Sequence, residues 1–114
     1  MILFKPESKA KILAGMKWQT RKLWDRARAR EGAEHLVYLR PPMTGEKPFA
    51  RILVTRVWKE RLADMSEEDA VAEGFATKAE FLEQFARINN PKLRGKRLED
   101  VEVYAVAFQV LETF

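Results

Sequence analysis

Hydrophobic and polar residues along the chain follow two patterns, one typical of strands and one typical of helices. Residues 49–60 and 99–111 are rich in β-branched and aromatic side chains and predict two long strands. In residues 49–60 the apolar positions fall on both faces, which predicts a strand packed on both sides. Shorter segments at 2–4, 17–23 and 35–39 complete a set of five expected strands.

Two segments carry the end signals of short helices. The first spans residues 7–14, with Ser8 near its start and Gly15 placed to end it. The second begins at Ser66, which opens a capping-box-like run, and ends at Gly74. Both helices are therefore expected to be only two to three turns long.

A third helix begins at Thr77, where Glu80 completes a capping box. Its apolar side chains have helical spacing and are Phe81, Leu82, Phe85 and Ile88. We expect the run Asn89-Asn90-Pro91 to end this helix, because proline removes a backbone donor and clashes with the preceding turn. Residues 41–48, with three prolines and a glycine, predict a loop.

The predicted element order is β-α-β-β-β-α-α-β. Strands and helices do not alternate regularly, so a doubly wound α/β sheet fits poorly. We predict an α+β fold, a small and partly open β-barrel with short helices packed at its ends. The chain of 114 residues contains no repeat or linker, which predicts a single domain over residues 1–114.

Composition excludes several classes of site. The chain has no cysteine, so disulfides, Cys-ligated zinc, iron–sulfur clusters and thiol nucleophiles are ruled out. Its one histidine, His35, begins an apolar strand, and we interpret it as structural. We therefore expect no metal and no cofactor. The longest apolar run is far too short to span a bilayer, and the N-terminal one is too short for a signal peptide, which predicts a cytoplasmic protein with no membrane partner.

Charge is distributed unevenly along the chain. The net charge is +4, but residues 1–61 hold 15 Lys and Arg against 6 Asp and Glu, whereas residues 62–114 hold 6 against 11. This asymmetry indicates an anionic partner for the first half, with nucleic acid as the leading candidate. The alternative is that the two halves neutralise each other within the fold.

The basic residues concentrate between residues 17 and 30. Cations bind phosphates and indole faces stack on bases, so the candidate nucleic-acid contacts are Trp18, Arg21, Lys22, Arg26, Arg28 and Arg30. The last three alternate with alanines, and an extended backbone would place their guanidinium groups on one side. The alternative is that the tryptophans pack in the core and the cations form a solvated face.

Three residues are candidates for acid–base chemistry. Lys17 and Thr20 supply an amine and a hydroxyl, but residues three apart lie on opposite faces of a strand, so their cooperation requires a bend after Gly15. Glu73 lies in the last turn of a helix, at the unfavourable end of the dipole. Burial in a cleft would make this carboxylate suitable for proton transfer, whereas a solvated side chain would have no such role.

The segment Gly15-Met16-Lys17-Trp18-Gln19-Thr20-Arg21-Lys22 resembles the signature of the ASCH domain, a PUA-like β-barrel family. The signature is a glycine, a lysine two residues later, and polar or charged residues three and five positions beyond that lysine. Segment 65–75, which includes Glu73, and the closing strand 103–108 are also similar to the family. The resemblance covers essentially the whole chain.

The resemblance implies binding of RNA or a modified nucleoside in a cleft beside the barrel. Some small bacterial members are amidohydrolases that deacetylate N4-acetylcytidine, and their catalytic positions correspond to Lys17 as base, Thr20 as nucleophile or substrate contact, and Glu73 as proton shuttle. Trp18 stands where those enzymes have threonine, and Lys22 where the family usually has arginine. Three functions follow as hypotheses: an RNA- or nucleoside-binding module, a metal-independent amidohydrolase, and a noncatalytic adaptor in RNA metabolism.

Overall fold

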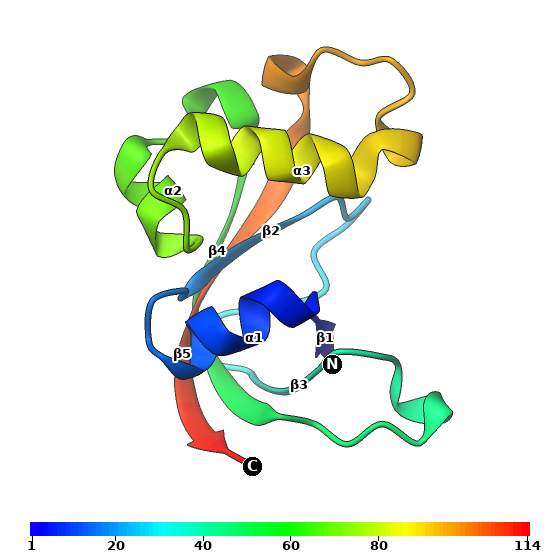
Figure 1. Cartoon of the computed structure of the whole chain (residues 1–114), viewed down its shortest axis with the longest axis vertical. Helices are drawn as coiled ribbons and strands as arrows, with labels where there is room; N and C mark the ends of the chain where they lie inside the picture. The colour runs from blue at the N-terminus through cyan, green and yellow to red at the C-terminus, as the bar shows by residue number, and fades with distance from the viewer.

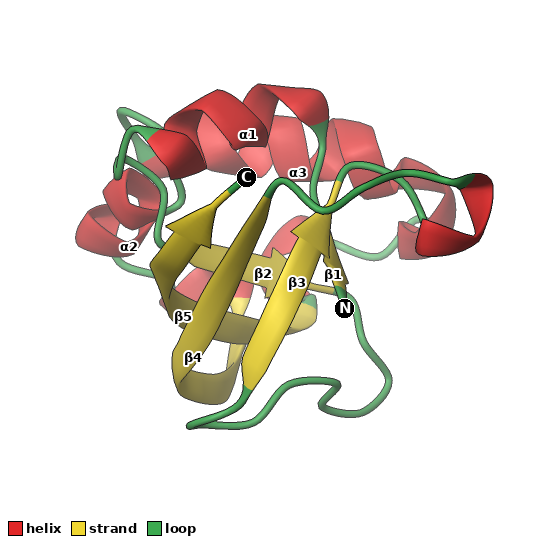
Figure 2. Cartoon of the chain, turned by 90° about the horizontal axis from the view of Figure 1, so that it is seen from below, coloured by secondary structure: helices red, strands yellow, loops and turns green.

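The computed structural model describes residues 1–114 and contains one five-stranded sheet. Its strands are β1 (Ile2–Leu3), β2 (Gln19–Lys22), β3 (Glu34–Tyr38), β4 (Ala50–Arg61) and β5 (Glu102–Thr113), in the spatial order β1-β3-β4-β5-β2. β1 pairs with β3 in parallel, and the other neighbours are antiparallel. The sheet is strongly curled, as Figure 2 shows, which confirms the predicted partly open barrel.

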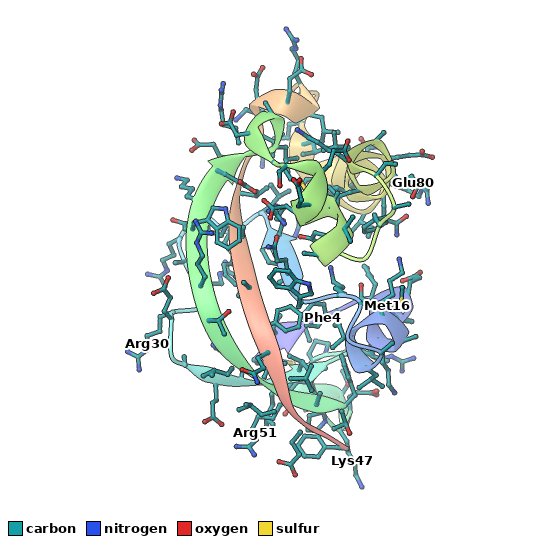
Figure 3. The ribbon with its side chains drawn as sticks, turned by 90° about the vertical axis from the view of Figure 1, so that its left-hand side faces the viewer. Phe4, Met16, Arg30, Lys47, Arg51 and Glu80 are labelled. Carbon is teal, nitrogen blue, oxygen red and sulfur yellow. The ribbon has the colours of Figure 1, made fainter.

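Three helices lie on the same side of this sheet (Figure 3). They are α1 (Pro6–Leu13), α2 (Glu67–Ala72) and α3 (Lys78–Leu93). Short 3₁₀ turns at Pro42–Thr44, Leu62–Asp64 and Leu98–Asp100 complete the chain. In Figure 1, α1 lies below α3, and β2 passes between them. None of the helices combines the length and the hydrophobicity needed to cross a membrane.

The predicted helix starts at Ser66 and Thr77 are confirmed. The Ser66 hydroxyl accepts a hydrogen bond from the Asp69 amide at 3.0 Å, and the Thr77 hydroxyl accepts one from the Glu80 amide at 3.2 Å. Each bond satisfies an amide that the helix itself leaves free.

Two helix ends differ from the prediction. α1 begins at Pro6, one residue before the predicted start at Glu7, because the fixed φ and missing amide of proline suit the first helical position; Ser8 does not cap it. α3 does not stop at Asn89-Asn90-Pro91 but continues to Leu93. Leu93 packs against the apolar cluster beneath the helix, and Arg94 and Gly95 then end it with positive φ values. Packing of the last turn therefore outweighs the cost of proline within it.

A bulge explains the apolar residues on both faces of β4. The register with β5 shifts between Val54 and Arg56, so the strand changes phase there. Val54 is fully buried, and Val57, three residues later, packs against the same small cluster. The bulge turns residues of opposite parity toward one core, which accounts for part of this pattern, and the half-buried Trp58 next to Val57 lies against Arg21. β5 also begins later than predicted, after the turn at Leu98–Asp100.

The core is divided into two main clusters. One lies under α1 and comprises Ile2, Phe4, Ile12, Val37, Phe49, Ala50, Ile52 and Phe108. The other lies under α2 and α3 and comprises Leu62, Met65, Ala70, Phe81, Phe85, Val101 and Val103. The long pair β4–β5 runs through both, and β2 lies between the helices that cover them (Figure 1).

Candidate functional site

Five buried polar side chains occupy the region between the two clusters. They are Lys17, Gln19, Thr20, Arg21 and Glu73, each no more than 5% exposed. Four of them come from β2 and the segment before it, and the fifth comes from the end of α2. Buried polar groups are stable only when they are hydrogen-bonded or paired, so their partners define the site.

Lys17 and Glu73 form a direct ion pair. The Lys17 Nζ donates to Glu73 Oε1 at 2.6 Å and to the Glu73 backbone carbonyl at 3.0 Å. Gly15, with a φ of 75°, ends α1 and reverses the chain, after which the Trp18 amide donates to the Ala72 carbonyl at 2.8 Å. The turn after α1 is thereby fastened to the end of α2, and Lys17 is brought to Glu73.

Arg21 holds the same carboxylate from the other side. Its Nη1 donates to Glu73 Oε2 at 3.0 Å, and its Nε donates to Glu60 Oε1 at 2.7 Å. Its Nη2 lies 3.2 Å from Asp69 Oδ2 without hydrogen-bond geometry. The Arg21 side chain is completely buried, so this guanidinium is a partner of carboxylates within the fold and has no access to solvent.

Gly74 permits the close approach of these segments. Its φ is 96°, and a Cβ at this position would lie 2.8 Å from the Lys11 Cδ and 3.5 Å from the Lys17 Cβ. The Lys11 Nζ donates to the Gly74 carbonyl at 2.7 Å. A glycine is therefore required both for the backbone conformation and for the space that two lysine stems fill.

Lys17, Thr20 and Glu73 line one cleft of about 760 Å³. β1, β2, α1 and α3 supply most of its walls, and the aromatic residues among them are Phe4, Trp24, Phe75, Phe81 and Phe85. Seven cationic residues border it, against two carboxylates, Glu7 and Glu73. The cleft thus combines an apolar wall with an excess of positive charge. No group of three or more His, Asp or Glu residues is placed to hold a metal ion.

Lys22 connects the two edges of the curled sheet within this cleft. Its Nζ donates to the Leu3 carbonyl of β1 at 2.7 Å and lies 5.1 Å from the centre of the Phe4 ring. Burial, reinforced by the positive charge of Lys17, lowers the pKa of Lys22 to about 8, although Glu73 opposes the shift. Lys22 is thus a half-buried cation that loses its proton at a lower pH than an ordinary lysine.

The structure brings some of the predicted nucleic-acid contacts to the cleft and leaves others outside. Arg21, Lys22 and Arg28 line it, and the Arg21 side chain is held there by carboxylates of the protein. Trp18 is 49% exposed but lines a separate, smaller cavity beside α1. Arg26 and Arg30 are exposed and do not border the cleft, and Arg30 projects from the side opposite the helices (Figure 3).

The bend required for Lys17 and Thr20 to act together is present. Lys17 precedes β2 in an irregular segment, whereas Thr20 belongs to the strand, and both reach the cleft. The sequence prediction did not include Gln19, Glu60 and Asp69, which complete the network around Arg21. Asp69 lies in the first turn of α2, where the helix dipole already accounts for an acid, and nothing in its spacing indicates a partner in β2.

No protein-family model matches the chain, and no curated protein matches it. The solved structures that are similar to it include the following two. A protein of Enterococcus faecalis V583 from the family DUF984 is 20% identical, with a TM-score of 0.79, over 98% of this chain and 76% of that one. An ASCH domain from Lactobacillus crispatus JV V101 is 22% identical, with a TM-score of 0.72, over 90% of this chain and 69% of that one. The chain therefore has the fold of the ASCH domains, the small α+β PUA-like barrel that the sequence resemblance implies.

Proposed function

We propose that the protein binds a modified nucleoside, free or within RNA, in the cleft lined by Lys17, Thr20 and Glu73. The observation that carries the proposal is the convergence of these three side chains on one cavity with an aromatic wall. A volume of about 760 Å³ lies within the usual range for small-molecule sites. The fold, shared with an ASCH domain, supports the same class of ligand.

The chemistry of the cleft matches a nucleobase. A base presents a flat π-face and an edge of alternating hydrogen-bond donors and acceptors, and aromatic side chains stack on the face. The Lys17–Glu73 pair sets an ammonium donor directly beside a carboxylate acceptor. A carboxylate has about four acceptor sites, so Glu73 keeps capacity for a ligand after binding Lys17 and Arg21.

Amide hydrolysis is the second candidate, because an amine, a carboxylate and a hydroxyl share the cleft. The Lys17–Glu73 hydrogen bond of 2.6 Å provides a path for a proton, and Thr20 lines the same cavity. On N4-acetylcytidine, a water oxygen would add to the acetyl carbonyl and the bond from that carbon to N4 would break. One proton of the water would pass through the pair to N4, leaving cytidine and acetic acid, which ionises to acetate by releasing the other proton to solvent.

One experiment tests both candidates. Binding of N4-acetylcytidine is measured by calorimetry, and its conversion to cytidine is followed by chromatography, for the unaltered protein and three variants. Glu73→Gln and Lys17→Met are expected to abolish turnover and weaken binding. Glu68→Gln, on the exposed side of the same helix, is the matched control and is expected to change neither.

The outcomes separate the hypotheses. Binding without turnover supports the nucleoside-binding module and rejects the hydrolase. Turnover that persists in both Glu73→Gln and Lys17→Met would refute the residue assignment. Failure of N4-acetylcytidine, other modified nucleosides and short RNA to bind at low salt would overturn the proposal and favour the adaptor.

A further inference from the structure

Three lysines at one end of the cleft form no ion pair within the protein. Glu73 is shared between Lys17 and Arg21, and Lys11 is bound to the Gly74 carbonyl. Arg28 pairs with Asp25 at 3.3 Å. By contrast, no carboxylate lies within ion-pair distance of the remaining cleft lysines, which are Lys5, Lys22 and Lys92.

These three lysines converge although they come from different elements. Lys22 ends β2, Lys5 immediately precedes α1, and Lys92 belongs to the last turn of α3. In Figure 1 the end of β2, the start of α1 and the end of α3 all lie toward the right-hand side of the molecule, and the three lysines line one cleft. Burial is the largest cause of the lowered pKa of Lys22, and the positive charges of Lys5 and Lys92 add to it.

The cleft therefore has two chemically different ends. The Lys17–Glu73 pair, near the start of β2 and the end of α2, is locally compensated and offers both a donor and an acceptor. The other end has three lysines and one carboxylate, Glu7 in the first turn of α1, which forms no ion pair with them. The Lys22 Nζ gives one hydrogen to the Leu3 carbonyl and retains two. Such an arrangement favours a ligand that is hydrogen-bonding at one end and anionic at the other.

Resting on the proposed function, we propose that the ligand is a nucleotide whose phosphate is bound by Lys22, Lys5 and Lys92 while its base lies at the Lys17–Glu73 pair. A phosphate monoester carries roughly −1.5 to −2 charges at neutral pH and accepts several hydrogen bonds. It supplies a counter-charge for three lysines that form no ion pair within the protein. In this arrangement Lys22 contacts the phosphate of a nucleotide and has no such contact with a nucleoside.

The test compares ligands that differ only in the phosphate. Calorimetric affinities are measured at low salt for N4-acetylcytidine, its 5′- and 3′-monophosphates, and a short RNA that carries the same base. We expect a monophosphate to bind about tenfold or more tightly than the nucleoside, because charge-assisted hydrogen bonds are the strong ones. If the RNA binds more tightly than the monophosphates, the bound phosphate is part of an RNA backbone. If it does not, the ligand is a free nucleotide.

Two variants assign the phosphate site. The double variant Lys5→Gln/Lys92→Gln removes two exposed lysines whose side chains make no hydrogen bond in the protein, so folding is expected to be unaffected. It should reduce the preference for the monophosphate over the nucleoside by about tenfold. Lys22→Met should reduce it further. Lys47→Gln/Lys96→Gln makes the same change in net charge away from the cleft and should leave the preference intact.

The result that would overturn the inference is equal affinity for nucleoside and monophosphates in the unaltered protein. An undiminished preference in Lys5→Gln/Lys92→Gln would also overturn it. Either result leaves the nucleoside site standing, since the nucleoside still binds. The proposed function itself fails only if neither the nucleoside, its monophosphates nor the RNA binds.

Discussion

At the scale of single residues, Glu73 is the group on which the buried polar network depends. It accepts hydrogen bonds from Lys17 and Arg21, both of which lie deep in the protein. A buried cation that loses its partner keeps the full cost of its desolvation. Glu73 is therefore required for stability as well as being a candidate for binding, and these two roles have to be separated by experiment.

We expect Glu73→Ala to lower the free energy of unfolding by about 3–5 kcal/mol, because it leaves two buried cations without this counter-charge. Urea denaturation measures the change. Glu68→Ala, on the solvent-exposed side of α2, should change stability by about 0.5 kcal/mol or less. Comparable effects of the two substitutions would contradict the role assigned to the Glu73 carboxylate.

Lys22 should make stability depend on pH. Its pKa in the folded protein is about 8, below the value of about 10.4 for an unfolded lysine. Between these values the unfolded chain binds more protons, so this group makes the free energy of unfolding rise as pH increases from about 8 to about 10.4. Burial and the charges of Lys17, Lys5 and Lys92 cause the shift, and Glu73 opposes it.

The measurement is urea denaturation at pH 7.5 and pH 9.5 for the unaltered protein and for Lys22→Met. We expect the difference in stability between the two proteins to move in favour of the unaltered one at the higher pH. The Lys22 Cε resonance, followed by NMR, should titrate with a midpoint of about 8. A midpoint near 10.4, the unperturbed value, would show that the amine is not desolvated.

At the scale of elements, the connection from α2 to α3 determines where Glu73 lies. α2 has only six residues, too few to form a stable helix alone, and depends on its Ser66 cap and on packing. Gly74 ends it and lies against the stems of Lys11 and Lys17 from the first half of the chain. This contact holds α2 in the position that places Glu73 in the cleft.

A pair of glycine substitutions separates backbone strain from this contact. Gly15 and Gly74 both follow a helix with positive φ, but an added Cβ at Gly15 meets nothing within 4 Å. Gly15→Ala should therefore lower stability only by the cost of the left-handed conformation, about 1–2 kcal/mol. Gly74→Ala should lower stability by clearly more, as thermal and urea denaturation would show, and equal losses would mean that the Lys11 side chain moves aside freely.

At the scale of the whole molecule, the uneven charge along the chain has two origins. Some of it is internal, because Lys17 and Arg21 from the basic half pair with Glu73 and Asp69 from the acidic half. The rest remains on the surface or in the cleft. Internal pairing therefore accounts for part of the asymmetry, and an anionic partner for the remaining cations stays a prediction.

Arg26 and Arg30 are the surface cations that the sequence indicates as phosphate contacts outside the cleft. If RNA is the physiological form of the ligand, Arg26→Gln/Arg30→Gln should weaken RNA binding and leave nucleoside binding unchanged. Two lost phosphate contacts would lower the slope of log affinity against log salt by about 1.4 for a single strand. Fluorescence anisotropy at several salt concentrations measures this slope, and an unchanged slope would place RNA on another face.

The local pattern of the sequence was sufficient for the element order, the α+β class and the caps at Ser66 and Thr77, because propensity and capping depend on near neighbours. The local pattern failed where contacts between distant residues determine the structure. The end of α3 depends on the packing of Leu93 against the apolar cluster under α2 and α3, and the alternation of buried residues in β4 depends on a bulge opposite β5. The motif residues Lys17, Thr20 and Glu73 were likewise visible in the sequence.

Only the tertiary structure decided what those residues do to one another. Curling of the sheet brings its edge strands β1 and β2 together, so that Lys22 reaches Leu3, and the docking of α2 brings Glu73 to Lys17 across 56 residues of chain. The tertiary structure also determines which cations are paired internally: Arg21 is buried among carboxylates, whereas Arg26 and Arg30 are exposed to solvent. Charge and hydrogen-bonding capacity belong to the residue type, whereas desolvation and pairing belong to the folded arrangement.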